Sequence, residues 1–126
     1  MTNKFDIDLA YGLGVENKLL EALKGDKIEV KAERAHWQRT GNIAIETFSR
    51  GKPSGINVTE ADYWAHTLMR ENGEPYCFML FPTPVLKGIV RFYLDNRPEC
   101  VKMGGDGGTS EMILLPLKEI IKPRKV

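Results

Sequence analysis

The stretch that decides the fold is GDKIEVKAERAHWQRTGNIAIETFSRGKPSGI, which runs from Gly25 to Ile56. Lys27–Arg34 alternates apolar with charged residues, and Asn42–Ser49 is rich in apolar and β-branched residues, so both segments are predicted to be strands. The segment His36–Gly41 between them is predicted to be a hairpin loop. The pattern therefore indicates two neighbouring antiparallel strands at the centre of the fold.

The predicted hairpin carries charged side chains where a sheet would bury apolar ones. Side chains alternate between the two faces of a strand, so Glu29 and Lys31 share one face. An antiparallel pairing of Glu46 with either residue adds a second carboxylate to that face, provided that no bulge shifts the register. Glu29, Lys31 and Glu46 are thus expected to converge.

Two carboxylates a few ångströms apart repel each other unless a cation lies between them. Mg²⁺ suits such a site, because it binds carboxylate oxygens and keeps several waters. Lys31 would then hold a phosphate, or help to position or deprotonate an attacking water. The alternative is a solvent-exposed strand face with a structural ion pair.

Charge is unevenly distributed along the chain. The formal net charge is only +1, which does not by itself indicate a nucleic-acid-binding protein. The segment 27–52 is more basic than the rest, because its lysines and arginines outnumber its glutamates: Lys27, Lys31, Arg34, Arg39, Arg50 and Lys52 against Glu29, Glu33 and Glu46. This segment is therefore the part expected to contact phosphates.

Several short pieces of sequence occur in an order that is familiar from one family. They are FDIDLAYG, Glu16, IEVKAE, TGNIAIE, GKPSGI and TEADYW, and together they span about half of the chain. In this order they resemble the PD-(D/E)XK nuclease superfamily, in particular small phage-type endonucleases related to Holliday-junction resolvases. The resemblance implies an α/β fold of the restriction-endonuclease type, with a mixed β-sheet flanked by helices.

The resemblance also implies roles for individual residues. Glu29 and Lys31 match the E-x-K pair, Glu46 matches the acid of the adjoining strand, and Glu16 resembles the helix acid of junction-resolving members. No Pro-Asp precedes Glu29, and Asp26 lies only three residues before it. In an alternative alignment Glu29 is the first acid and Glu46 the second, with the lysine displaced onto the first strand.

The implied activity is hydrolysis of DNA phosphodiester bonds by a metal-dependent endonuclease, with branched DNA among its substrates. The catalytic residues would be Glu16, Glu29, Lys31 and Glu46, and the three glutamates would be the ligands of Mg²⁺, for which Mn²⁺ is a plausible substitute. The alternative from another class is a catalytically inactive nucleic-acid-binding module of the same fold.

Two loops carry candidate contacts to nucleic acid. Trp37 in the first loop is flanked by Arg34 and Arg39, so it is expected either to stack on a base while the guanidinium groups hold phosphates, or to fold back onto the sheet. In the turn after the second strand, Lys52 and Ser54 offer a charge and a hydroxyl to the backbone of DNA.

Composition and length favour one domain over residues 1–126. Hydrophobic residues make up 42% and charged residues 28%, which is ordinary for a globular protein, and no apolar run approaches the ~20 residues of a membrane span. The start of the chain lacks the apolar core of a signal peptide, so the expected location is the cytoplasm, that of a bacterial host cell if a phage encodes the chain. Cys77 and Cys100 lack the spacing of a zinc site, and Cys77 is expected to be a buried free thiol.

Local patterns predict three longer helices and two further strands. Val15–Lys24 is expected to be a helix after an extended Phe5–Leu9, with a buried stripe that carries Glu16 beside its leucines. Thr59–Arg70 is expected to be a helix with Trp64 in the core, and His66 on it receives no role. In the C-terminal half, Tyr76–Phe81 is expected to be a strand buried on both faces, and Met112–Leu115 is expected to be another strand. Val85–Tyr93 is expected to be a helix capped by Thr83, and Pro116–Ile121 a short helix or a turn.

The predicted third helix indicates a homodimer. It is apolar on more than one side, through Ile89, Val90, Phe92 and Tyr93. A domain of this size offers one candidate metal site, and a symmetric cut of two strands requires two sites related by a twofold axis.

Overall fold

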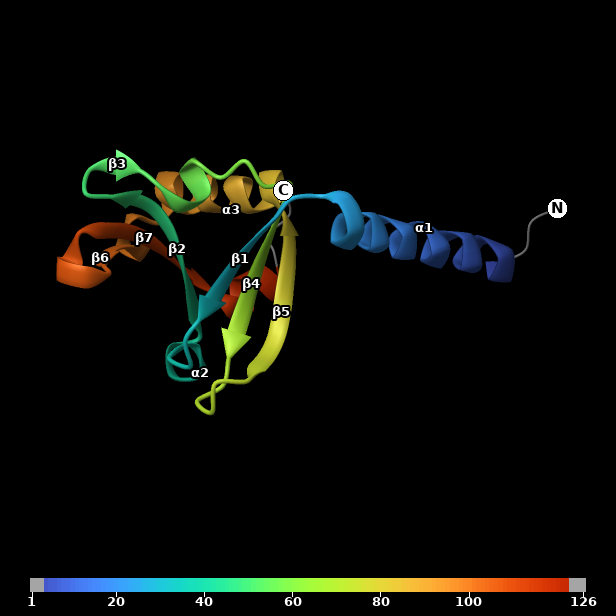
Figure 1. Ribbon diagram of the computed structural model, residues 1–126, viewed down its shortest axis with the longest axis horizontal. Helices are drawn as coiled ribbons and strands as arrows, with labels where there is room; N and C mark the ends of the chain where they lie inside the picture. Colours follow the sequence, from blue (N-terminus) through green and yellow to red (C-terminus); the bar gives the residue numbers. More distant parts are fainter. Residues whose placement is uncertain (1–3, 123–126) are drawn as a thin grey trace.

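The computed structural model describes residues 4–122, without the side chains of Phe5 and Asp106. Two β-sheets pack with one long helix against a common core, and a second long helix extends away from this body (Figure 1). The elements in chain order are α1 (Lys4–Gly25), β1 (Ile28–Glu33), α2 (Trp37–Thr40), β2 (Asn42–Ser49), β3 (Lys52–Pro53), η1 (Gly55–Asn57), β4 (Tyr63–Met69), β5 (Pro75–Pro82), α3 (Thr83–Asn96), η2 (Pro98–Cys100), β6 (Val101–Gly104), η3 (Asp106–Gly108), β7 (Ser110–Pro116) and α4 (Leu117–Ile121).

One sheet is mixed and the other is antiparallel. In the first sheet the strand order is β1-β4-β5, with β1 parallel to β4 and β4 antiparallel to β5. In the second sheet the order is β3-β2-β7-β6, and all neighbours are antiparallel. The prediction of a mixed α/β class is confirmed at this level.

The predicted hairpin between the first two strands is wrong. β1 pairs with β4, so that Glu29 lies beside Trp64 and Lys31 beside His66. β2 pairs with β7 in the other sheet, where Glu46 lies opposite Met112. The two strands were assigned to their residues correctly, but the short helix α2 lies between them in place of a hairpin turn and sends them into different sheets.

The core lies between the two sheets and α3. β2 alternates buried and partly exposed residues, as a strand with one covered face must. The buried apolar residues come from both sheets and from α3, namely Ile43, Ile45, Ile56, Trp64, Leu68, Phe81, Leu86, Val90, Tyr93, Ile113 and Leu115. The prediction that Trp64 belongs to the core is confirmed, since its side chain is 1% exposed.

The segment predicted as a helix over Thr59–Arg70 contains a strand, β4. The Thr59 hydroxyl accepts a hydrogen bond from the Ala61 N–H, which forms a local turn and not a helix cap. β4 is the central strand of its sheet, and its five consecutive buried residues, Trp64 to Leu68, need cover on both faces. Pairing with β1 and β5 therefore outweighs the local capping signal.

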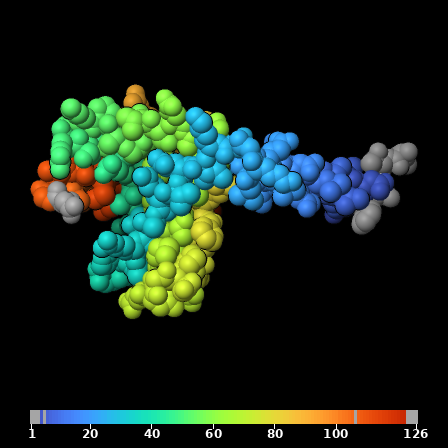
Figure 2. Space-filling model, in the orientation of Figure 1, coloured from blue at the N-terminus to red at the C-terminus, as the bar shows by residue number. Residues whose placement is uncertain are grey.

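Helix α1 is longer than predicted and projects as an arm (Figures 1 and 2). Phe5–Leu9 belongs to the helix and is not extended, whereas the prediction that the helix ends at Gly25 is confirmed. The stripe predicted to be buried is exposed, and Ala22 is the one buried residue of the helix among those whose side chains are described. We call Lys4–Gly25 the arm.

Helix α3 uses its apolar residues inside the protein. Val90 and Tyr93 are 3% and 5% exposed, and Ile89 packs against the core. The apolar surplus from which a dimer was predicted is therefore largely consumed by the fold, and Phe92 is its exposed remainder. Thr83 lies in the first turn of α3 with Pro82 as N-cap, so the predicted Thr83 cap is wrong.

The end of the chain is tied to α3 by Arg97. Its guanidinium donates hydrogen bonds to Glu99 at 2.6 Å and to Glu119 of α4 at 3.1 Å, and it lies over the Tyr93 ring. The hydrogen bond from Arg97 lowers the pKa of Glu99, and these carboxylates raise the pKa of Arg97. The segment Pro116–Ile121, predicted to be a short helix or a turn, contains the helix α4. No helix within residues 4–122 is long and apolar enough to cross a membrane.

Candidate functional site

Glu29 and Lys31 lie on one face of β1, as their spacing predicted. The Lys31 Nζ is 4.0 Å from the Glu29 Oε1. The Lys31 side chain is 47% exposed and the Glu29 side chain is 39% exposed. The Lys31 ammonium also lies 5.8 Å from the centre of the Trp64 ring, within the range of a cation–π contact. Both charged groups are therefore held near the surface and stay accessible to a ligand.

Glu46 lies in the other sheet, and the hairpin that was expected to bring it beside Glu29 and Lys31 is absent. It is partly exposed and precedes a bulge in β2, where the pairing with β7 shifts between Glu46 and Phe48. Gly55 of η1 lies against the Glu46 backbone, because a Cβ at Gly55 would collide with the Glu46 carbonyl. Gly55 also has a φ of +54°, which glycine adopts at little cost. The turn after β3 thus fixes the neighbourhood of Glu46.

The segment from Gly55 to Ala61 connects the surroundings of Glu46 with those of Glu29. Its first residue lies on the Glu46 backbone, and its last four line an open hollow beside β1. The hollow has a volume of about 430 Å³ and is lined by Lys27, Ile28, Glu29, Val58, Thr59, Glu60 and Ala61. Glu60 was not predicted as a site residue, although it belongs to the TEADYW piece. It adds a carboxylate to the hollow that holds Glu29.

The carboxylates do not form a ready-made metal site. Among residues 4–122, no group of three or more His, Cys, Asp or Glu residues is placed to hold a metal ion. Glu16, predicted as the third ligand, lies on the exposed arm and not at the hollow. Mg²⁺ commonly uses one or two carboxylates and completes its shell with water and phosphate oxygens, so Glu29 and Glu46 remain the candidate ligands.

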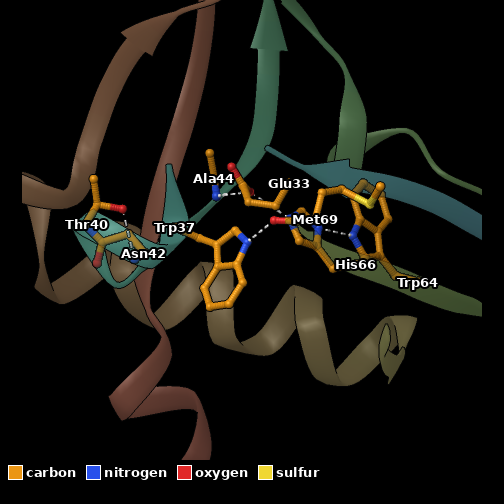
Figure 3. A network of polar contacts seen from close by, with 8 residues as sticks. All are labelled: Glu33, Trp37, Thr40, Asn42, Ala44, Trp64, His66 and Met69. Carbon is orange, nitrogen blue, oxygen red and sulfur yellow. Dashed lines mark hydrogen bonds and ion pairs between the residues drawn. The ribbon is translucent and has the colours of Figure 1, made fainter. Parts of the chain in front are cut away.

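A buried polar network starts at Trp64, the residue whose ring Lys31 approaches, and is drawn in Figure 3. The Trp64 Nε1–H donates to the His66 Nδ1 at 3.1 Å, and the His66 Nε2 lies 2.8 Å from the Glu33 Oε1. The same carboxylate oxygen accepts a hydrogen bond of 2.8 Å from the Ala44 N–H of β2. Because Nδ1 accepts from Trp64, the ring proton of a neutral His66 lies on Nε2 and is donated to Glu33.

Sequence reasoning missed this network. His66 is 3% exposed on β4, whereas it was predicted to lie on the face of a helix without a role. The available signal was the alternation in IEVKAE, which places Glu33 on the face of Glu29 and Lys31. The partner of Glu33 lies 33 residues away, and no local pattern indicates it.

Trp37 folds back onto the sheet, which was one of the two predicted outcomes. Its Nε1–H donates to the Met69 carbonyl at 2.7 Å, and its ring lies 5.3 Å from the Tyr76 ring. The indole is therefore occupied by contacts within the chain. Arg34 and Arg39 on either side of it are exposed.

Lys52 and Ser54 differ in their access to a ligand. Lys52 of β3 is exposed, as a phosphate contact requires. The Ser54 hydroxyl is buried without a hydrogen-bond partner, so the turn would have to open before it could contact a phosphate.

A larger hollow of about 710 Å³ lies between Gly41, Arg97 and the start of α4. It contains none of the predicted site residues, and its one guanidinium is already bound by Glu99 and Glu119. The volume of this hollow alone therefore does not indicate a catalytic or binding site.

Comparisons of the chain with protein-family models, with curated proteins and with solved structures give no match. The function must accordingly be argued from the residues and their geometry.

Proposed function

We propose that the chain is a Mg²⁺-dependent endonuclease that hydrolyses DNA phosphodiester bonds, with Mn²⁺ as a working substitute. The observation that supports this best is the accessible Glu29–Lys31 pair, in which Glu29 lines an open hollow. The segment Gly55–Ala61, part of which lines the same hollow, also lies against the Glu46 backbone. An acid and an ammonium that are this close and only partly buried form a weak structural pair, so their exposure favours a role in binding a ligand.

Each residue has a distinct part in this reaction. Glu29 and Glu46 would hold the cation and leave positions for water and for a phosphate oxygen. A bound Mg²⁺ would activate a water for in-line attack and neutralise charge on the phosphate. The Lys31 ammonium would hold the scissile phosphate, and its contact with Trp64 limits its freedom before the substrate arrives. Glu60 at the rim of the hollow would bind a water of the cation's shell.

Exposed basic side chains near β1 and β3 would hold the DNA backbone. Arg34 and Arg39 lie at the end of β1 and on α2, and Lys52 lies on β3. Contacts of this kind position the duplex without reading its sequence. Replacing Arg34 and Arg39 together by alanine should weaken binding to all DNA sequences alike and reduce the dependence of affinity on salt.

The second candidate is a nucleic-acid-binding module without catalytic activity. It is favoured by the observation that residues 4–122 contain no group of three potential metal ligands. The same arginines and Lys52 would then bind DNA, while Glu29 and Lys31 would form a surface ion pair.

A cleavage assay separates the two candidates. Labelled duplex and four-way-junction DNA are incubated with the protein and Mg²⁺, Mn²⁺ or a chelator. The endonuclease predicts cleavage that requires the metal and is lost in Glu29→Gln and in Glu46→Gln, while Glu74→Gln in the β4–β5 turn serves as a control with an exposed carboxylate elsewhere. DNA binding without cleavage in every metal would reject the endonuclease and favour the second candidate.

Calorimetry tests the metal site independently of activity. Titration of Mg²⁺ or Mn²⁺ should show binding to the wild type and at least tenfold weaker binding to Glu29→Gln. Equal binding by both proteins would remove Glu29 from the site. The Glu60→Gln variant is expected to weaken binding less than Glu29→Gln, because a water-mediated ligand contributes less than a direct one.

A further inference from the structure

The β1–β4–β5 sheet has one face packed in the core and one outer face. Trp64, His66 and Glu33 point to the inner side, so alternation places the intervening residues on the opposite side. The outer face is made of paired residues from three strands, namely Val30, Ala32, Ala65, Thr67, Phe78 and Leu80. None of these residues is charged.

This outer face is exposed along its edge strands β1 and β5, whereas Ala65 and Thr67 on the central strand are buried between them. Val30 is 64% exposed and Phe78 is 69% exposed, although β5 was predicted to be buried on both faces. Sheets with parallel strands normally have both faces covered, usually by helices. A contiguous apolar face without cover marks a surface on which another element packs.

The arm carries a stripe that has no cover either. Leu9, Leu13, Glu16, Leu20 and Leu23 follow one another at intervals of three or four residues and so lie on one side of the helix. The four leucines of this stripe are between 42% and 60% exposed. Figure 2 shows the arm standing clear of the body.

The stripe and the outer face match in length and in polarity. Leu9 to Leu23 spans about 21 Å along a helix, and a strand of the length of β1 spans about 20 Å. Both surfaces are apolar apart from Glu16 on the stripe and Thr67 on the face, and the Thr67 hydroxyl is buried within its own chain.

The arm is directed away from the body of its own chain (Figures 1 and 2). Its last residue, Gly25, is followed by Asp26 and then by Lys27, whose backbone is fixed by Asp62. The Lys27 N–H donates to the Asp62 carboxylate at 3.1 Å, and the Lys27 carbonyl accepts from the N–H groups of Asp62 and Tyr63. With Lys27 held on both sides, the direction in which the arm leaves β1 is set, and it points outward (Figure 1).

We propose that the arm of one copy packs on the outer face of a second copy, and that the exchange is reciprocal in a twofold dimer. Two such contacts, at roughly 500 Å² from each surface, bury about 2,000 Å², which is in the range of stable dimers. The dimer does not depend on the proposed nuclease activity.

Light scattering at micromolar concentration tests the dimer. The wild type should have the mass of two chains, and the double variant Leu13→Glu, Leu20→Glu should dissociate at least tenfold more readily. The matched control is Ile7→Glu, Tyr11→Glu, which places the same two charges on the opposite side of the arm at residues that are also exposed. A monomeric wild type, or an equal effect of both double variants, would overturn the proposal. Circular dichroism checks that α1 stays helical.

Disulfide trapping distinguishes exchange from packing within one chain. In a Cys77→Ser, Cys100→Ser background, one chain carries Leu20→Cys and another, with a tag, carries Val30→Cys. On mixing and oxidation the two different chains should become linked, whereas Tyr11→Cys in place of Leu20→Cys should give little product. A disulfide that forms only when both cysteines are placed in one chain, without linkage between chains, would show that the arm folds onto its own sheet and would reject the exchange.

Discussion

The Glu33 carboxylate accepts a hydrogen bond of 2.8 Å from the Ala44 N–H, and through this contact the edge of β1 meets the edge of β2. The two strands do not pair along their length. One side chain therefore connects the two sheets at the point where a hairpin was predicted, and the same oxygen lies 2.8 Å from the His66 Nε2. This arrangement makes Glu33 the structural junction of the candidate site.

Replacing Glu33 should destabilise the protein. In Glu33→Ala, both the Ala44 N–H and the His66 Nε2–H lose their acceptor in a partly buried position. Unpaired donors of this kind cost about 1–3 kcal/mol each, so the free energy of unfolding should fall by about 2–6 kcal/mol. Urea denaturation measures this. The control is Glu29→Ala, whose partly exposed ion pair should change the stability by less than about 1 kcal/mol; equal losses would contradict the junction.

Replacing Gly55 should be costly for two reasons. A Cβ in Gly55→Ala would collide with the Glu46 carbonyl, and alanine would have to adopt a φ of +54°. Gly73→Ala is a matched control, because Gly73 has a φ of +85° but open space around it. Gly73→Ala should lose about 1 kcal/mol and Gly55→Ala clearly more, at least about 2 kcal/mol. The melting temperature of Gly55→Ala should therefore be lower than that of Gly73→Ala. Similar melting temperatures would show that the Glu46 backbone can shift at little cost in free energy.

Replacing Lys31 should separate catalysis from binding. Under the proposed function, Lys31→Ala removes the ammonium group that contacts the scissile phosphate. The cleavage rate should therefore fall at least a hundredfold. DNA affinity should fall no more than about threefold, because Lys31 supplies one phosphate contact among several. Filter binding beside the cleavage assay measures both quantities. A Lys31→Ala protein that cleaves at the wild-type rate would leave the residue as a partner of Glu29 alone.

The Arg97–Glu99 pair should contribute to stability in a pH-dependent way. The hydrogen bond from Arg97 lowers the pKa of Glu99 below its ordinary value of 4.5, so the folded protein binds this proton less readily than the unfolded chain does. The contribution is therefore fully present above about pH 4.5 and is lost as the pH falls through the lower, folded value. The difference in urea midpoint between the wild type and Glu99→Gln should shrink between pH 6 and pH 3. A difference that stays constant over this range would exclude the pair as its source.

The elements with strong local patterns were predictable, whereas their partners were not. The alternation in IEVKAE and NIAIETFS identified both strands, because it arises from a covered and an open face within each strand. The pairing of β1 with β4 could not be predicted, since Glu29 and Trp64 are brought together by contacts distant in the sequence. Tyr63–Met69 was mistaken for a helix because Thr59 and Asp62 imitate a capping box, although Asp62 in fact binds the Lys27 backbone.

In the candidate site, too, local relationships were predictable and contacts between distant segments were not. Glu29 and Lys31 were predictable as neighbours because their relation is set by the strand period alone. Glu60 and His66 were missed because each depends on where a distant segment lies, the first on the turn after η1 and the second on β4. The exposed side of the arm was also missed, since its leucine periodicity predicts a covered stripe without showing what covers it.

The parallel pairing of β1 with β4 also sets an order of assembly. Lys27 and Asp62, which start this pairing, are 35 residues apart, so β1 has no neighbour in its sheet until the chain has reached β4. β4 and β5 are joined by a short turn and can associate early, whereas closing the long loop to β1 is slower. In a nascent or truncated chain that lacks β4, Glu29 and Lys31 therefore have no neighbouring strand. Any substitution that delays the β4–β5 hairpin should delay the appearance of the site by the same time.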